Sequence, residues 1–314
     1  MRAATIHDGK VHVAEHPDPE PGHGEILLRV HAAGINGADL LQRRGAYPAP
    51  PGAPADVPGL ELAGEVVALG PGATRFVLGE RAMAIVGGGG QAELCTVHER
   101  QAMPVPVAVG AVEAGGLPEV FTTAHDALFA QAGLRMGERL LVSGAAGGVG
   151  SAAVQLAAAA GAHVTASVRD PALRDGVRAL GAHEALDPDD TAEAGPYDVL
   201  LELVGAPNLE ANVRAMQRFG RVVVIGVGAG FKAQVSLLSV MGRRLTIGGS
   251  TLRARPLEEK AATARAMERE VLPLFERGVL RVPVAARFAL DEVAAAYDRF
   301  AAGGKLGKVI LELQ

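Results

Sequence analysis

VSGAAGGVGSAAVQLAAAAGAHVTASVRD, the stretch from Val142 to Asp170, decides the fold of this chain. It opens at the end of an aliphatic run typical of a buried strand, passes through a glycine turn and continues as a helix of small residues. A second strand pattern follows the helix. Free N–H groups at such a helix N-terminus suit a pyrophosphate, so this context predicts a dinucleotide-binding βαβ unit.

The glycines of the turn have different expected roles. Gly147 leaves room for the backbone to approach a phosphate, and Gly150 lets the helix pack closely on the strand. The first position of the G-x-G-x-x-G pattern is Ala145, with Gly144 just before it. The alternative is a tight strand–helix turn that holds no ligand. The predicted pyrophosphate-binding residues are Ala146, Gly147, Gly148 and Val149.

The adenosine end of the cofactor is expected at the tip of the next strand. An acidic residue there binds the ribose hydroxyls of NAD, whereas a basic residue accepts the extra phosphate of NADP. About 19 residues after Gly150 the chain reaches Arg169, and Ser167 lies beside it. These two residues predict NADPH as the cofactor, with a solvated charge as the alternative for Arg169. Asp170 before Pro171 is typical of a helix N-cap.

Strand and helix patterns alternate through the middle of the chain, which predicts an α/β fold with a doubly wound parallel sheet. The expected strands are 139–143, 163–168, 198–203, 221–225 and 244–247, and the expected helices are 148–160, 171–180 and 209–218. The first third reads instead as short strands, 11–13, 25–31, 62–69, 80–86 and 92–97. Gly45–Gly59 is too rich in proline for helix or central strand. A long helix over 256–277 and a closing strand complete the pattern.

Composition excludes several classes of protein. The net charge of −5 argues against a nucleic-acid surface, which needs a basic excess. The sequence contains no run of about 18 apolar residues, so no membrane span is predicted, and the first residues lack the apolar core of a signal peptide. The single cysteine, Cys95, cannot form an internal disulfide, and we expect it to be a small buried residue. A reducing cytoplasm is the expected compartment.

Several motifs in the same order extend the interpretation to nearly the whole chain. HAAGINGADLLQRRGAYP, VPGLELAGEV, the glycine turn, GRVVVIGVGAG and GKLGKVIL together resemble the medium-chain dehydrogenase/reductase superfamily, and within it the zinc-free quinone oxidoreductase branch. GLPEVFTTAHDAL and STLRARPLEEKA resemble the NADPH quinone reductases related to the p53-inducible quinone oxidoreductase. The resemblance implies a GroES-like catalytic domain, residues 1–118 and 255–314, around a Rossmann domain, residues 119–254. It also implies a homodimer formed through the edge strand near 244–250.

No metal is expected. Zinc enzymes of the superfamily carry a cysteine in the stretch matched here by Gly34–Asp39, which contains Asn36, and a histidine where this chain has Leu60. One cysteine cannot supply a catalytic and a structural zinc site. The nine histidines show no short-spaced pair, and His125 is expected at a helix start or a cleft wall.

The resemblance places Asn36 and Tyr47 near the nicotinamide and the acceptor, and both are the predicted catalytic residues. Tyr47 either donates a hydrogen bond to a quinone oxygen or packs on the prolines of its loop. Asp39 and Arg43 are four residues apart, so on a helix they are expected to form a structural salt bridge, with a catalytic role as the alternative. Glu61 is expected to be buried behind the site, with a catalytic role as the alternative.

Other positions follow from the same resemblance. Thr123 matches a threonine that holds the nicotinamide carboxamide, Val227 and Gly228 should lie against the nicotinamide, and Ser250 is a further cofactor-site candidate. Leu252 and Arg253 are expected to line the cleft. Lys305 and Lys308 either reach a cofactor phosphate or are surface charges.

The expected reaction is hydride transfer from NADPH to a quinone. The product anion is delocalised and aromatic, so it needs less stabilisation than the alkoxide that zinc supports. An enoyl or alkenal double-bond reductase, with Tyr47 as proton donor, is one alternative. A non-catalytic NADPH-binding protein is the other.

Overall fold

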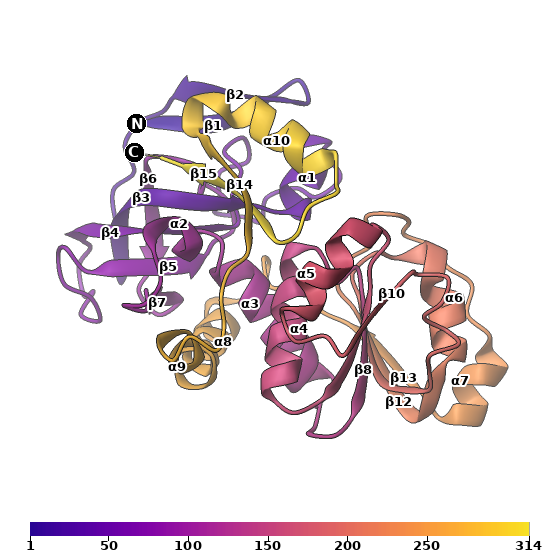
Figure 1. The fold of residues 1–314 in the computed structure, drawn as a ribbon. Coiled ribbons are helices and arrows are strands. Elements are labelled where there is room, and N and C mark those ends of the chain that lie inside the picture. The colour runs from indigo at the N-terminus through magenta and orange to yellow at the C-terminus, as the bar shows by residue number, and fades with distance from the viewer. Residues whose placement is uncertain (314) are drawn as a thin grey trace. The chain divides into compact units, whose positions relative to one another are not determined.

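The structure is a computed structural model that describes residues 1–313, and the chain forms two compact units (Figure 1). Unit 1 comprises residues 1–122, 252–303 and 308–313, and unit 2 comprises residues 123–251 and 304–307. The sequence placed 304–307 with the β-rich domain, whereas these four residues cluster with unit 2.

Unit 2 is built on a six-stranded sheet with the order β10-β9-β8-β11-β12-β13. All neighbouring strands are parallel. The chain moves outward from β8 first to one side and then to the other, so a topological switch point lies between β8 and β11. The doubly wound sheet expected from the sequence is thus confirmed. Its strands are β8 (Arg139–Ser143), β9 (His163–Ser167), β10 (Glu184–Leu186), β11 (Tyr197–Glu202), β12 (Met216–Val224) and β13 (Thr246–Gly249).

Helices cover both faces of this sheet. Figure 1 shows α4 (Gly148–Ala159) and α5 (Arg174–Arg178) on one face and α6 (Ala206–Arg214) and α7 (Leu237–Arg243) on the other. The expected helix 171–180 begins as a 3₁₀ turn, Pro171–Leu173, and only then becomes α5. The expected helix end at 218 is wrong, because β12 already begins at Met216.

Unit 1 contains a β1–β2 hairpin (Arg2–His7, Lys10–Glu15) and a seven-stranded sheet with the order β14-β15-β3-β4-β5-β7, in which β6 also pairs with β3. The strand β3 continues to Ile35, beyond the expected end at His31, because β15 pairs with residues 32–35. The remaining strands are β3 (Glu25–Ile35), β4 (Glu61–Leu69), β5 (Arg81–Ile85), β6 (Leu94–His98), β7 (Ala102–Pro104), β14 (Val284–Ala289) and β15 (Lys308–Glu312).

Short helices connect these strands. They are α1 (Gly37–Arg43), α2 (Ala111–Ala114), α3 (Pro118–His125), α8 (Leu257–Glu270), α9 (Leu272–Glu276) and α10 (Val293–Ala301), and α3 continues into a π-helix, Asp126–Gln131. The long helix expected over 256–277 is divided at Val271, because Pro273 has no N–H to continue the hydrogen-bond ladder. Gly45–Gly59 forms neither helix nor strand, as expected.

Candidate cofactor and acceptor sites

The glycine turn joins β8 to α4 at the switch point of unit 2. Gly147 is the N-cap of α4, and a Cβ atom there would meet only the Gly144 oxygen, at 3.5 Å. On Gly150, by contrast, a Cβ would lie 2.4 Å from the Gly144 carbonyl oxygen and 2.6 Å from Cα of Ala145. The turn is therefore open at Gly147 and closely packed at Gly150. Ala146, Gly147, Gly148 and Val149 are all partly exposed, so a phosphate can approach them.

A buried carboxylate that the sequence analysis missed bonds to Ser143, the residue just before the glycine turn. Glu202 ends β11 with no exposed surface, and its Oε1 accepts hydrogen bonds from Ser143 Oγ (2.9 Å), Val204 N (2.7 Å) and Gly205 N (2.9 Å). These bonds join the C-terminal ends of β8 and β11. The available signal was an acid inside the aliphatic run DVLLELVG.

The end of β9 carries the two residues expected at the adenosine phosphate. Ser167 is buried, whereas Arg169 is exposed and forms no hydrogen bond or ion pair within residues 1–313. Asp170 Oδ1 accepts a hydrogen bond from Ala172 N (3.0 Å), which confirms the N-cap interpretation. The nearby Arg174 guanidinium already donates hydrogen bonds to the Val168 carbonyl oxygen and to Asp187 Oδ2. Arg169 is thus a free cation at this strand tip.

The other expected cofactor residues also belong to unit 2. Val227 and Gly228 follow β12, and Ser250 follows β13, so all three lie at the same C-terminal edge of the sheet as the glycine turn. Ser250 Oγ donates a hydrogen bond to Asp126 Oδ2 (2.8 Å). Thr123 is buried within α3. The topology brings these positions to one edge, and their contact with a nicotinamide stays a prediction.

In unit 1, Asn36 belongs to a buried polar cluster. Asn36 Nδ2 donates to Glu61 Oε1 (2.9 Å), and Lys308 Nζ donates to Asn36 Oδ1 (2.6 Å). Lys308 Nζ also lies 2.6 Å from Glu61 Oε1, and Glu61 Oε2 accepts from Glu119 N (2.8 Å). Lys308 is 2% exposed and Glu61 is 0% exposed. Both interpretations of Lys308, as a phosphate ligand or a surface charge, are therefore wrong, whereas the expected burial of Glu61 is confirmed.

The expected Asp39–Arg43 pair does not form. Asp39 is fully buried and accepts hydrogen bonds from Asn36 N (2.7 Å) and Gly59 N (3.1 Å). Burial raises the pKa of its carboxyl to about 6. The Arg43 guanidinium instead lies 5.6 Å from the centre of the Tyr297 ring. Asp39 sits in the first helical turn, where free N–H groups attract an acid more than the half-buried Arg43 does.

Arg253 holds the loop that carries Tyr47. The residue is 2% exposed, and its guanidinium donates to the carbonyls of Gly87 (2.8 Å) and Tyr47 (3.1 Å) and to Gln42 Oε1. It also lies 5.0 Å from the centre of the Tyr47 ring. The sequence placed Arg253 on the cleft wall, but its polar atoms are used inside unit 1, because a cation buried there needs hydrogen-bond acceptors around it.

Tyr47 itself is half-buried, and its hydroxyl has no hydrogen-bond partner in the described chain. Burial raises the pKa of the phenol above its usual value, so it carries its proton at neutral pH. A protonated, unpaired phenol is a ready hydrogen-bond donor for a ligand oxygen.

The remaining titratable candidates have structural surroundings. Cys95 is buried, as expected, and burial raises the pKa of its thiol to about 12. His125 ends α3, with its ring 5.2 Å from that of Phe129. Lys305 is half-buried in unit 2, and both of its interpretations stay open. No group of three or more His, Cys, Asp or Glu within residues 1–313 is arranged to hold a metal ion.

Two family models match this chain. Residues 22–131 match the alcohol dehydrogenase GroES-like domain, and residues 148–269 match the zinc-binding dehydrogenase family. Human quinone oxidoreductase is 30% identical over 309 residues, which cover 94% of this chain and 91% of the human protein.

Solved structures of similar proteins align with the whole of this chain. The quinone oxidoreductase of Thermus thermophilus, solved alone and in complex with NADPH, aligns with a TM-score of 0.87 at 34% identity over all of both chains. An alcohol dehydrogenase superfamily protein from Novosphingobium aromaticivorans aligns with a TM-score of 0.90 at 30% identity, also over all of both chains.

Proposed function

The chain belongs to the medium-chain dehydrogenase/reductase superfamily, and from this premise we propose that it is a zinc-independent oxidoreductase that transfers a hydride from NADPH to a quinone. The observation that carries the proposal is the glycine turn, open at Gly147 and closed at Gly150, at the N-terminus of α4. Its backbone N–H groups fit a pyrophosphate. The names of the relatives support a quinone as the acceptor.

The residues of this chain have defined tasks in the proposed reaction. The cofactor, when bound, supplies the hydride. Tyr47 donates its unpaired hydroxyl to the acceptor oxygen on which negative charge develops. Asn36 stays a candidate by position, but its amide is already bonded to Glu61 and Lys308. Leu60, buried where zinc enzymes have a histidine, offers no ligand atom to a metal.

Initial rates of NADPH oxidation with an ortho-naphthoquinone and with 2-hexenal test the proposal. Turnover of the quinone supports it. Turnover of 2-hexenal alone would favour a double-bond reductase, which the unpaired Tyr47 hydroxyl could serve as proton donor. Tight NADPH binding with neither acceptor reduced would favour a non-catalytic binding protein.

Arg169→Ala is expected to weaken NADPH binding about 10- to 100-fold, because one charge-assisted hydrogen bond to the extra phosphate is lost. NADH binding should not change. Dissociation constants from cofactor fluorescence give both values. Arg218→Ala is the matched control, since Arg218 is exposed near the N-terminal end of β12, at the opposite edge of the sheet. Equal losses for both cofactors would contradict the NADPH assignment.

Tyr47→Phe is expected to lower kcat for the quinone about 10- to 100-fold, the effect of one lost hydrogen bond to a developing anion. The ring stays beneath Arg253, so the loop should keep its place. Steady-state kinetics and a thermal melt measured on the same sample separate the two effects. An unchanged kcat would show that Tyr47 only packs within its loop and donates no hydrogen bond to the acceptor.

We also propose a homodimer formed through β13, which ends the sheet of unit 2 and is exposed along its length. Exposed apolar side chains lie on β13 and on the preceding α7, with Ile247 43%, Leu238 72% and Met241 70% exposed. An uncovered strand edge beside such side chains favours pairing with a second copy. Within residues 1–313 no helix is long and apolar enough to span a bilayer. The single cysteine and the net charge of −5 favour a reducing cytoplasm and small-molecule partners.

Ile247→Lys is expected to yield monomers in analytical ultracentrifugation, because a lysine on an edge strand opposes pairing with a second strand. Val107→Lys is the control, since Val107 is 88% exposed in unit 1. A sedimenting mass equal to that of the unaltered protein would exclude this edge as the interface.

A further inference from the structure

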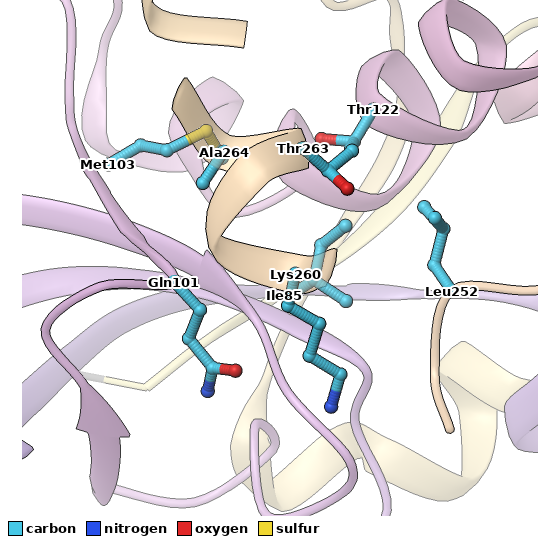
Figure 2. Close-up of a pocket in the computed structure, with 8 residues that line it drawn as sticks. All are labelled: Ile85, Gln101, Met103, Thr122, Leu252, Lys260, Thr263 and Ala264. Atoms are coloured by element: carbon cyan, nitrogen blue, oxygen red, sulfur yellow. The ribbon is translucent and has the colours of Figure 1, made fainter. Parts of the chain in front are cut away.

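A small pocket lies within unit 1 between α8 and the segment that leads into β7 (Figure 2). Lys260 and Thr263 reach it from α8, Gln101 and Met103 from the β7 segment, and Leu252 from the chain before α8. Its free volume is about 20 Å³. That space admits one or two oxygen-sized groups and excludes an aromatic ring.

The pocket has hydrogen-bond donors that lack acceptors. Thr122 is 2% exposed, and its hydroxyl has no partner within residues 1–313. Neither the Lys260 ammonium nor the Gln101 amide forms a hydrogen bond or ion pair with any described side chain. None of the lining residues is acidic. Leaving a half-buried cation and a buried hydroxyl without acceptors costs folding free energy, because both groups lose their hydration. A ligand with anionic oxygens would accept hydrogen bonds from both.

The side chains are arranged for such a ligand. Figure 2 shows the Lys260 and Gln101 side chains extending in the same direction, with their nitrogen atoms at one side of the pocket. The hydroxyls of Thr122 and Thr263 lie at the other side. Burial, and after it the charge of Arg253, lowers the pKa of Lys260, which is consistent with a cation whose counter-charge is missing.

We propose that this pocket binds a carboxylate carried by the acceptor, an inference that rests on the proposed quinone reductase function. A carboxylate is planar, carries a single charge and presents two oxygens, which matches the size of the pocket and its donors. The location links it to the acceptor. Leu252 lines the pocket, and the next residue, Arg253, holds the Tyr47 carbonyl at 3.1 Å.

The test compares two quinones, 3-(3-methyl-1,4-naphthoquinon-2-yl)propanoate and its methyl ester, which differ in the carboxylate charge and one methyl group. With the intact enzyme and NADPH, kcat/KM is expected to be about 10- to 100-fold higher for the acid, the range of one charge-assisted hydrogen bond. Lys260→Met should remove this preference and leave kcat/KM for the ester unchanged, because Met removes the charge and keeps an unbranched side chain of similar helix propensity. Lys260→Arg should retain part of the preference for the acid. Thr122→Val should lower kcat/KM for the acid and leave that for the ester unchanged.

Lys10→Met serves as the control, since Lys10 is an exposed lysine of unit 1. Equal losses for acid and ester in Lys260→Met, or no loss, would overturn the inference. If the unaltered enzyme reduces neither quinone, the proposed function fails, and calorimetry with 3-(2-naphthyl)propanoate in the presence of NADPH then tests the pocket by itself. Binding that disappears in Lys260→Met would support a carboxylate site. Absence of binding to the unaltered protein would refute it.

Discussion

Lys308→Met is expected to lower the free energy of unfolding by about 3–5 kcal/mol, the cost of leaving one partner of a buried ion pair without the other. Glu61 has no exposed surface, and Lys308 Nζ lies 2.6 Å from its Oε1. The ammonium also donates to Asn36 Oδ1 and to the carbonyl of Ile35. Removing it strands a carboxylate in the apolar interior of unit 1. Urea unfolding followed by circular dichroism measures the change.

The double variant Lys308→Met/Glu61→Gln is the matched control. Gln keeps an acceptor for the N–H of Glu119 and removes the uncompensated charge, so the double variant should recover most of the loss. A midpoint in urea that shifts no more for Lys308→Met than for an exposed lysine would show that the pair contributes nothing to stability.

Gly150→Ala is expected to weaken NADPH binding about 10- to 100-fold, the effect of losing one charge-assisted hydrogen bond between the turn and the pyrophosphate. The added Cβ would lie 2.4 Å from the Gly144 oxygen and 2.6 Å from Cα of Ala145, and both of these atoms belong to the backbone. Neither can rotate away, so the turn itself must shift. The rise in melting temperature on adding NADPH gives the affinity, because a ligand that binds only the folded state stabilises it by mass action.

Gly242→Ala is the control for that experiment. Gly242 lies in α7, and a Cβ there would meet nothing within 4 Å, so the change should leave binding unaltered and favour the helix slightly. If Gly150→Ala lowers the melting temperature but binds NADPH as the unaltered protein does, the turn is a packing device and the cofactor lies elsewhere.

The sequence was sufficient for the α/β fold and for most elements. Strand β8 has the predicted ends, and α4 ends one residue before the prediction, because glycine turns and aliphatic runs act over a few neighbouring residues. One error arises where a distant chain segment intervenes. Strand β3 extends to Ile35 because β15 pairs with its end, and no local pattern contains that information.

The candidate site divides in the same way. Spacing alone located the glycine turn and Arg169, since both belong to one βαβ unit. Glu202 was missed, although an acid in an aliphatic strand is a local signal, because its value depends on the N–H groups that converge on it. The unpaired state of Tyr47 and the pocket at Lys260 likewise appear only when all their neighbours are known.

What the sequence by itself determined is therefore the βαβ unit with its glycine turn, whose strand, turn and helix are specified by adjacent residues. Only the tertiary structure decided the surroundings of Asn36 and Tyr47. Lys308 reaches Asn36 across 272 positions, because the antiparallel register sets Val309 opposite Ile35. Arg253 reaches the Tyr47 carbonyl across 206 positions. Both cations are buried by packing, and a buried charge must find its partners in space, whatever their distance along the chain.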